Sequence, residues 1–543
     1  MIGASAETAR IVLVGLEDQD NLGLRYLSSR LRQMGHCTRI VTVTEGPGPV
    51  LGAIQELVPH IVGFSLIFQY LVPQFARLLA GLRANGVTAH FTMGGHYASF
   101  EPEALLAAIP ALDSVVVFEG EDTLLELAEH IAAAADWRCV AGIAYRGRTG
   151  TTLNPVRPGR RDLDELPWPD RDDIDYTRQQ LPLASIIGGR GCPWKCSFCS
   201  IVTFYEGNGT KGRRWRDPKR IVDEIEYLHN ERGIRILLWQ DDDFLAGGAR
   251  GIQWAHAIGR ECIARGLHRN VRWKISCRSD ETRLDTLQPL VDAGLAHVYL
   301  GVESGDADNL KKMNKRETAE DHLMAGEVLR QLGLSFDFGF MLLEPWSTFT
   351  TLRNNISFLR RFAGDGAAVI GFVRLLPYAG TAVHSRLVAE GRLSSHQLDA
   401  DYRFMDPRLD AFYDWMLAAF HERNHSPSGT FLLLRLLLFE THLNLPGNPV
   451  DRALKEHVKA LTAVSNRMVL DMLEDAAEYI ESLSSVPAND PVLESLCRHS
   501  IAENRRIRRD LTVLLSGYPG TMAYSSCRLQ PIRTAEPRAS RAS

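Results

Sequence analysis

Short hydrophobic runs alternate with longer amphipathic stretches over residues 10–135. The stretches at 23–35 and 71–86 have the spacing of helices that bury one face. Strands separated by helices favour a parallel, doubly wound sheet, whose ligands bind beyond the carboxyl ends of the strands. The hydrophobic runs that predict buried strands are IVLVGL (11–16), HIVGFSL (60–66), AHFTMGG (89–95) and SVVVFEG (114–120).

The same alternation returns between residues 183 and 385. An amphipathic stretch at 217–233, opened by Asp217-Pro218, predicts one of the intervening helices. Six strands with helices between them favour a partial (β/α)6 barrel of the TIM type, in which chemistry takes place at the carboxyl ends of the strands. The six predicted strands are 184–189, 235–240, 271–276, 297–303, 335–343 and 368–376.

The remaining segments have other patterns. Residues 140–153 favour a hairpin, and the proline-rich, charged stretch after them favours a linker. Amphipathic stretches beyond residue 385 predict helices, which we expect to close the barrel mouth. A tail rich in Ser, Arg and Pro is typical of disorder. The expected organisation is an α/β chain with a first domain at 8–147, a linker at 148–180, a barrel at 181–385, helices at 386–516 and a tail at 517–543.

Composition adds limits to this picture. The 543 residues are 45% hydrophobic and 23% charged, as in ordinary globular proteins of more than one domain. A net charge of −5 gives no reason to expect nucleic acid or an anionic membrane as partner. The apolar run FLLLRLLLF (431–439) is interrupted by Arg435 and is shorter than the ~20 residues of a membrane helix. Scattered cysteines favour a reducing compartment, so we expect a cytoplasmic protein.

Three of the nine cysteines lie close together in GGRGCPWKCSFC (188–199), directly after the first predicted barrel strand. Cys192, Cys196 and Cys199 form a C-x3-C-x2-C array, which favours a metal site over a disulfide framework. Zinc and an iron–sulfur cluster are both open. A closed zinc site needs four ligands, and no fourth ligand is obvious nearby. A cluster held by three thiolates would leave one iron free for chemistry.

This array, with Phe198 before the last cysteine, resembles the signature of radical S-adenosylmethionine (SAM) enzymes. The resemblance implies a [4Fe-4S] cluster on the three cysteines. It also implies that the open iron binds SAM and that reductive cleavage gives a 5′-deoxyadenosyl radical. An electron donor of the flavodoxin or ferredoxin type is implied as a partner.

A second resemblance lies in the first domain. Residues 18–23 fit D-x-H-x-x-G with Asp20 in place of the histidine, and Ser65-Leu66-Ile67 and Gly94-Gly95 follow. This ladder is similar to the cobalamin-binding fold, except that Ile67 replaces a leucine. The segment EGE (119–121) is similar to one in cobalamin-dependent radical SAM proteins. Because Asp20 is no imidazole, we expect cobalamin without a histidine at cobalt. The cobalamin-binding residues implied are Asp20, Gly23, Ser65, Leu66, Gly94, Gly95, Glu119, Gly120 and Glu121.

Further candidates lie at the ends of the later barrel strands. Asp241, Asp242 and Asp243 follow the second strand, where related enzymes meet the amino group of SAM. Which aspartate turns inward is open, and each is equally a solvated loop carboxylate or a helix cap. Arg278 is a candidate for the carboxylate of SAM. Glu303 and Ser304 resemble the segment that contacts its ribose and carboxylate.

The order of domains resembles that of cobalamin-dependent radical SAM enzymes over roughly residues 10–385. The resemblance implies a C-methyltransferase for a small biosynthetic molecule, such as an antibiotic intermediate, acting through the 5′-deoxyadenosyl radical and methylcobalamin. The alternative is a cyclase or rearrangement enzyme with the same cofactors and no methyl transfer. A third interpretation, a cobalamin sensor or electron carrier without catalysis, fits the complete cysteine array less well.

Overall fold

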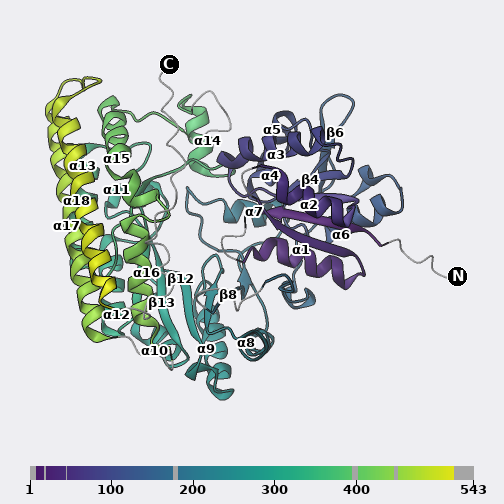
Figure 1. Ribbon diagram of the computed structural model, residues 1–543, viewed down its shortest axis with the longest axis horizontal. Helices are drawn as coiled ribbons and strands as arrows, with labels where there is room; N and C mark the ends of the chain where they lie inside the picture. Colours follow the sequence, from purple (N-terminus) through teal and green to yellow (C-terminus); the bar gives the residue numbers. More distant parts are fainter. Residues whose placement is uncertain are drawn as a thin grey trace.

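The computed structural model describes residues 8–16, 20–43, 46–174, 182–393, 401–445 and 451–518. Figure 1 shows the N-terminal α/β unit in purple at the right, the second α/β unit in teal at the centre, and the long C-terminal helices at the left. The predicted tail from residue 519 onward, the first part of the D-x-H-x-x-G motif (18–19) and the end of the predicted linker (175–180) lie outside the described residues.

The N-terminal unit is built on a seven-stranded sheet of order β2-β1-β3-β4-β5-β6-β7, parallel from β2 to β5 and antiparallel at β6 and β7. The four predicted strands and the predicted hairpin are confirmed. The strands are β1 (Arg10–Gly15), β2 (Cys37–Thr42), β3 (Ile61–Ser65), β4 (His90–Gly94), β5 (Ser114–Val116), β6 (Ile143–Arg146) and β7 (Thr151–Leu153), and the helices are α1 (Leu22–Gln33), α2 (Gly48–Leu57), α3 (Val72–Ala84), α4 (His96–Phe100), α5 (Pro102–Ala108) and α6 (Glu121–Ala132).

One strand of this sheet, β2, was not predicted. Its sequence CTRIVT is a half-exposed edge strand, and only Thr38 is buried. A hydrophobic run signals a strand that is covered on both faces, so an edge strand of mixed polarity does not give that signal.

The second unit contains six parallel strands in the order β15-β14-β13-β12-β11-β8, which form a half barrel. This confirms the predicted fold class and the six strand positions. The strands are β8 (Leu183–Ile186), β11 (Ile236–Trp239), β12 (Arg272–Arg278), β13 (Leu295–Glu303), β14 (Ser335–Leu343) and β15 (Val373–Arg374), and the helices between them are α8 (Pro218–Arg232), α9 (Ala249–Ala264), α10 (Leu284–Asp292), α11 (Ala307–Lys312), α12 (Ala319–Gln331), α13 (Phe349–Ala363) and α14 (Ala382–Ala389).

The two faces of the half barrel differ in polarity. On β12, Trp273 and Ile275 pack into the helical layer, whereas Lys274 and Ser276 point to the concave inner face. The inner side chains of β12 keep part of their surface accessible, while the outer ones are buried. This alternation places apolar groups against the helices and leaves polar groups around the hollow of the barrel.

The sixth strand is shorter than predicted. Only Val373 and Arg374 pair with β14, although the apolar run extends from 368 to 376. The segment before β15 is hydrogen-bonded to a C-terminal helix and not to β14. The Asn466 side chain of this helix accepts from the Ile370 N–H at 2.9 Å and donates to the Ala368 carbonyl at 2.8 Å. A side-chain amide thus replaces the strand partner that the pattern predicted.

Four C-terminal helices surround this unit: α15 (Pro407–His425), α16 (Thr430–Leu443), α17 (Arg452–Ser482) and α18 (Pro491–Ser516). Figure 1 shows α17 and α18 beside α13, on the outside of the barrel layer. By contrast, α16 lies against β13 and β14, and Arg272 at the start of β12 donates to the Leu443 carbonyl at its end. The expectation that these helices close the barrel mouth therefore needs correction, since α16 reaches the opposite, N-terminal end of the strands.

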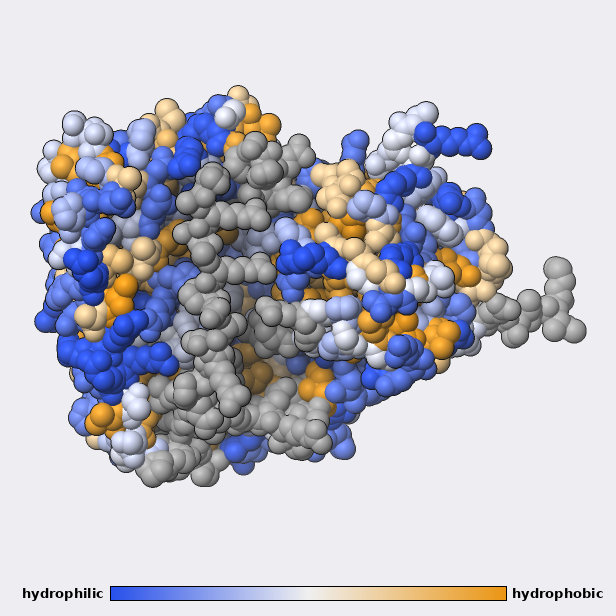
Figure 2. Space-filling model, turned by 45° about the horizontal axis from the view of Figure 1, so that its top comes forward, coloured by the Kyte–Doolittle hydropathy of each residue, from blue (hydrophilic) through white to orange (hydrophobic). Residues whose placement is uncertain are grey.

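In the part of the chain that the structure describes, no helix is both long and apolar enough to cross a membrane. The face drawn in Figure 2 is mostly hydrophilic over the C-terminal helices at the left, with apolar residues scattered among them.

Candidate functional site

The three cysteines lie on a loop that leaves the carboxyl end of β8 and is held on both sides. A short antiparallel pair, β9 (Gly189–Arg190) with β10 (Arg214–Trp215), closes its base. On the other side, the Ser197 N–H donates to the Met313 carbonyl at 2.8 Å. Gly191 has φ +92°, and a Cβ there would lie 2.3 Å from the Gly212 carbonyl oxygen, so this position accepts glycine alone.

The thiols sit in a poorly solvated place. Burial raises the pKa of Cys192 and Cys196, and it raises the pKa of Cys199 to about 12. Two of them also raise the pKa of a neighbouring thiol, since Cys199 acts on Cys192 and Cys196 acts on Cys199. Three thiolates here need a strongly positive partner, and metal binding supplies it while releasing the protons.

The spacing of these thiols bears on which metal they fit. Among the described residues, no group of three His, Cys, Asp or Glu side chains is spaced to hold a single ion. In an iron–sulfur cube each thiolate binds its own iron, so its ligands lie farther apart than those around one zinc. The three thiols of this loop match the number of protein ligands in a cluster that leaves one iron open.

The structure separates the roles of the three aspartates after β11. Asp241 forms a buried ion pair with Arg213 at 2.5 Å and accepts from the Gly188 N–H at 2.9 Å. Asp242 accepts from the Gly191 N–H at 2.8 Å, and burial raises its pKa to about 6. Both carboxylates thus fix the backbone of the cysteine loop.

Asp243 differs, because both of its carboxylate oxygens are buried and, among the described residues, the carboxyl group of Glu281 alone is in reach of a hydrogen bond. Burial raises its pKa, and Asp243 in turn acts on Cys192. The carboxyl group of Glu281 is near, since burial and Asp243 together raise the pKa of Glu281 to about 9. Arg213, Arg278 and Lys315 also act on the charge of Asp243, so this carboxyl group lies among charges of both signs beside the cysteine loop.

Arg278 ends β12 and lies over the ring of Trp194 at 4.1 Å. Its Nη2 forms an ion pair with Glu317 at 3.3 Å, whereas its buried Nη1 has no partner among the described residues. Lys315 lies beside it, 3.2 Å from Glu317 and 3.9 Å from Glu303. A free donor on a fixed guanidinium fits a carboxylate ligand. Lys315 and Glu317 were not predicted, because nothing in the local sequence marks them.

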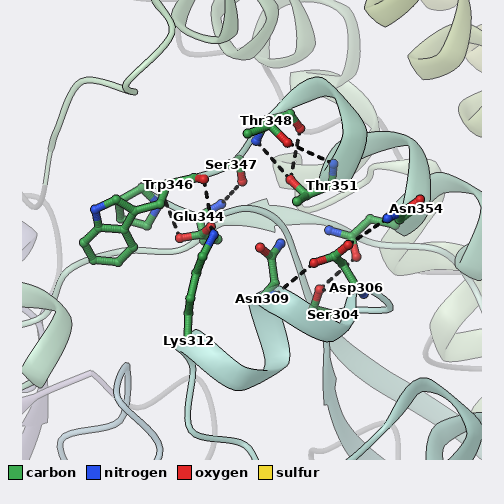
Figure 3. A network of polar contacts seen from close by, with 12 residues as sticks. Ser304, Asp306, Asn309, Lys312, Glu344, Trp346, Ser347, Thr348, Thr351 and Asn354 are labelled. Atoms are coloured by element: carbon green, nitrogen blue, oxygen red, sulfur yellow. Dashed lines mark hydrogen bonds and ion pairs between the residues drawn. The ribbon is translucent and has the colours of Figure 1, made fainter.

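Glu303 and Ser304, although adjacent, point in different directions. Glu303 has φ +68°, and its carboxylate lies by Gly301 and Gly339 on the inner face of the barrel. The Ser304 hydroxyl instead donates to Asn355 at 2.8 Å and accepts from the Asp306 N–H at 3.2 Å. Figure 3 shows Ser304 and Asp306 within a polar network at the base of α11. Phe198 packs against the barrel core.

A cavity of about 280 Å³ opens at the carboxyl ends of β1, β3 and β4, where the strand order reverses direction. Ligands of doubly wound sheets bind at this point, and its small side chains leave room for one. Phe204 and Tyr205 from α7 (Ile201–Gly207), which directly follows the cysteines, form part of its wall. The predicted residues that line it are Gly23, Ser65, Gly94, Gly95, Glu119, Gly120 and Glu121.

Two of the predicted cobalamin residues do not line this cavity. Leu66 is buried in the core of the sheet. Asp20 is turned toward the second unit, where it forms a buried ion pair with Arg171 at 2.9 Å and accepts from the Ser185 N–H at 2.9 Å. Asp20 thus pairs with an arginine 151 positions later in the chain and does not face the cavity. The absence of a histidine ligand at cobalt stays a prediction.

The two glutamates of the EGE segment join the cavity to the cysteine loop. Arg190 donates to Glu119 at 2.8 Å and to Glu121 at 2.7 Å, and Arg214 also donates to Glu119 at 2.9 Å. Burial opposes ionisation of Glu119, but Arg190 and Arg214 outweigh it and lower its pKa. These ion pairs bind the first sheet to the loop that carries Cys192.

One cavity residue, His96, was missed because the isolated histidines show no metal spacing. Its ring stacks on Phe204 at 4.2 Å, and burial lowers its pKa to about 4. The neutral imidazole thus stands between the cavity and α7.

Comparison with known proteins gives two matches to family models. Residues 11–128 match the B12 binding domain, and residues 186–354 match the radical SAM superfamily. The first match includes the cavity-forming strands β1, β3 and β4, and the second begins at the end of β8 and includes the cysteine loop.

Several curated proteins are similar to the chain. An uncharacterized methyltransferase of Pyrococcus horikoshii is 26% identical over 68% of this chain and 79% of its own length. The hopanoid C-3 methylase of Methylococcus capsulatus is 29% identical over 71% of each chain. The anaerobic magnesium-protoporphyrin IX monomethyl ester cyclase of Rubrivivax gelatinosus is 30% identical over 58% of this chain and 56% of its own.

Among solved structures, the cobalamin-dependent SAM radical enzyme OxsB has the same fold. Its structure with aqua-cobalamin and SAM bound aligns with a TM-score of 0.72 over 96% of this chain and 83% of its own, at 17% identity.

Proposed function

The chain is a cobalamin-dependent radical SAM enzyme, and on this premise we propose that it is a C-methyltransferase acting on a small biosynthetic intermediate, such as a precursor of an antibiotic. One observation supports this most. The cavity at the first sheet is walled on one side by Arg190, Phe204 and Tyr205, which flank the three cysteines in sequence. A methyl carrier there would lie next to the place where SAM is cleaved.

The residues of the chain have separate tasks in this proposal. Cys192, Cys196 and Cys199 would hold the cluster, and Asp243 and Arg278 would hold the amino and carboxylate groups of SAM. Gly23, Ser65 and Gly94 would admit cobalamin. When bound, the cluster supplies the electron that cleaves SAM, and cobalamin supplies a transferable methyl group. An electron donor of the flavodoxin or ferredoxin type belongs to the same proposal.

Labelled SAM tests the transfer. With SAM carrying a deuterated methyl group, a reductant and the substrate, we expect a product heavier by one intact labelled methyl group and 5′-deoxyadenosine in step with it. The measurement is mass spectrometry of the product and chromatography of 5′-deoxyadenosine. Product without label, formed while 5′-deoxyadenosine still accumulates, would contradict methyl transfer.

That contrary result would favour the second candidate, a cyclase or rearrangement enzyme with the same cofactors. The similarity to the Rubrivivax gelatinosus cyclase supports this candidate. The chain spans only 56% of that relative, compared with 71% of the hopanoid methylase and 79% of the uncharacterized methyltransferase, so methyl transfer is better supported.

The role of Asp243 can be tested apart from turnover. We expect Asp243→Asn to weaken SAM binding about 10- to 100-fold, because a charged hydrogen bond contributes about 1.5–3 kcal/mol. Equilibrium dialysis of SAM against cluster-loaded protein measures this. Asp223→Asn, which alters an exposed aspartate paired with Arg265, should bind SAM like the wild type. Equal affinity of Asp243→Asn and wild type would show that Asp243 does not contact SAM.

A further inference from the structure

We propose that the inner face of the half barrel contains an oxyanion-binding site, formed by Lys274 and Arg435, that anchors a phosphate or carboxylate group of the substrate. The inference rests on the proposed function, because it concerns the substrate of the same barrel. It goes beyond that function by naming the chemical class of one substrate group and the residues that bind it.

The two cations come from different elements that face each other. Lys274 lies on the inner face of β12, and its ammonium group lies 5.8 Å from the ring centre of Tyr299 on β13. Arg435 reaches in from α16, the helix that lies against β13 and β14 (Figure 1), and pairs with Asp337 on β14. In the strand register Lys274 lies opposite His297, and Tyr299 and Asp337 form the next inward-facing level, two residues closer to the carboxyl ends of the strands.

The carboxylate that faces these two cations is already engaged. Asp337 accepts from His297 Nε2 at 3.0 Å through one oxygen and from Arg435 Nε through the other. Burial opposes its ionisation, but His297, Arg435 and Lys274 outweigh that effect and lower its pKa. Burial lowers the pKa of His297 and Asp337 opposes that effect, while the His297 Nδ1 contacts the Ser335 hydroxyl at 2.6 Å.

Lys274 is therefore a cation in excess. Its side chain makes no hydrogen bond or close ion pair with any residue in the described ranges, and its ammonium group faces the ring of Tyr299. Burial lowers its pKa, and Asp337 only partly opposes this. Two cations against one carboxylate leave one positive charge on the inner face, and an oxyanion would neutralise it.

The site is open to a ligand. Arg435 keeps 32% of its side-chain exposure, and Lys274 and Tyr299 are only partly buried. Above them on the inner face, Gly301, Glu303 and Gly339 are also only partly buried, and the two glycines leave room for the Tyr299 hydroxyl and the Glu303 carboxylate. The inner face is thus partly accessible from the anion site to Glu303.

The strand geometry sets the size of the substrate. Lys274 lies four residues before Arg278 on β12, and a strand rises about 3.3 Å per residue, so the anchor is ~13 Å below the level of Arg278. A substrate held there by its oxyanion would place its reacting carbon about 13 Å away, at the strand ends. Such a molecule has an anionic end and an extended body.

Binding of simple oxyanions tests the site without knowledge of the substrate. The melting temperature of the full-length, cluster-loaded and cobalamin-bound protein is measured in sodium phosphate, sodium acetate and sodium chloride at equal ionic strength. We expect phosphate or acetate to raise the melting temperature above that in chloride, because a ligand of the native state stabilises it. Lys274→Met should lose this rise, whereas Lys274→Arg and the exposed-site control Lys219→Met should keep it.

The outcomes separate the alternatives. A rise with phosphate alone assigns a phosphoryl group, and a comparable rise with acetate assigns a carboxylate. Where Lys274→Met fails to fold, Arg435→Gln provides the second variant and should also lose the rise. No rise above chloride in the wild type, or the same rise in Lys274→Met, would overturn the proposal. Because no turnover is measured, failure of methyl transfer would leave this result unaffected.

Discussion

Cys196→Ala is expected to abolish cleavage of SAM and to leave cobalamin binding largely intact. Removal of a ligand should cost more than the 10- to 100-fold typical of the groups around a metal site, because the cluster would keep only two thiolates. Cys196 lies in the cysteine loop, whereas the cobalamin cavity is lined mainly by residues of the first sheet. The measurements are iron content, 5′-deoxyadenosine yield with a reductant, and the absorption spectrum of bound cobalamin.

A buried cysteine elsewhere in the barrel unit provides the control. Cys262 on α9 is 1% exposed and packs in the core. Cys262→Ala also removes a cysteine sulfur, but not one that binds the cluster. This variant should therefore retain iron and SAM cleavage. An undiminished yield of 5′-deoxyadenosine from Cys196→Ala would refute the ligand assignment.

The sequence predicted features whose causes are local. Runs that are covered on both faces, such as β3 and β4, can be recognised in the sequence because most of their residues are apolar. The helix at 217–233 was confirmed as α8, whose Asp217 cap and left-handed Gly233 are short-range signals. The cysteine array is likewise a local pattern.

Features that depend on distant partners could not be predicted. Asp241, Asp242 and Asp243 were equivalent in the sequence, and only their separate partners distinguish them. Asp20 meets Arg171 across 151 positions in the chain. The excess charge of Lys274 likewise depends on Arg435, a residue on a helix far along the chain. Such pairings are set by tertiary packing, which a single sequence does not display.

The same kind of long-range contact underlies the second large effect that we expect, at Arg190. This guanidinium is 11% exposed and joins Glu119 and Glu121 to the base of the cysteine loop. Arg190→Met would leave the buried Glu121 without its arginine partner. Glu119 would lose one of its two arginine partners and keep Arg214. Removing one member of a buried ion pair costs about 3–5 kcal/mol, because the remaining charge loses its partner.

This cost should appear mainly in cobalamin binding, since Arg190, Glu119 and Glu121 all line the cavity. We expect Arg190→Met to bind cobalamin at least about 100-fold more weakly, as 3 kcal/mol is a factor of more than 100. Arg190→Lys should recover part of the affinity, because it restores the charge without the two-pronged geometry. Arg265→Met is the control, since Arg265 also has several carboxylate partners but lies within the barrel unit. Titration with cobalamin measures the affinity of each variant, and iron content is checked alongside. Wild-type affinity in Arg190→Met would show that these ion pairs do not shape the cavity.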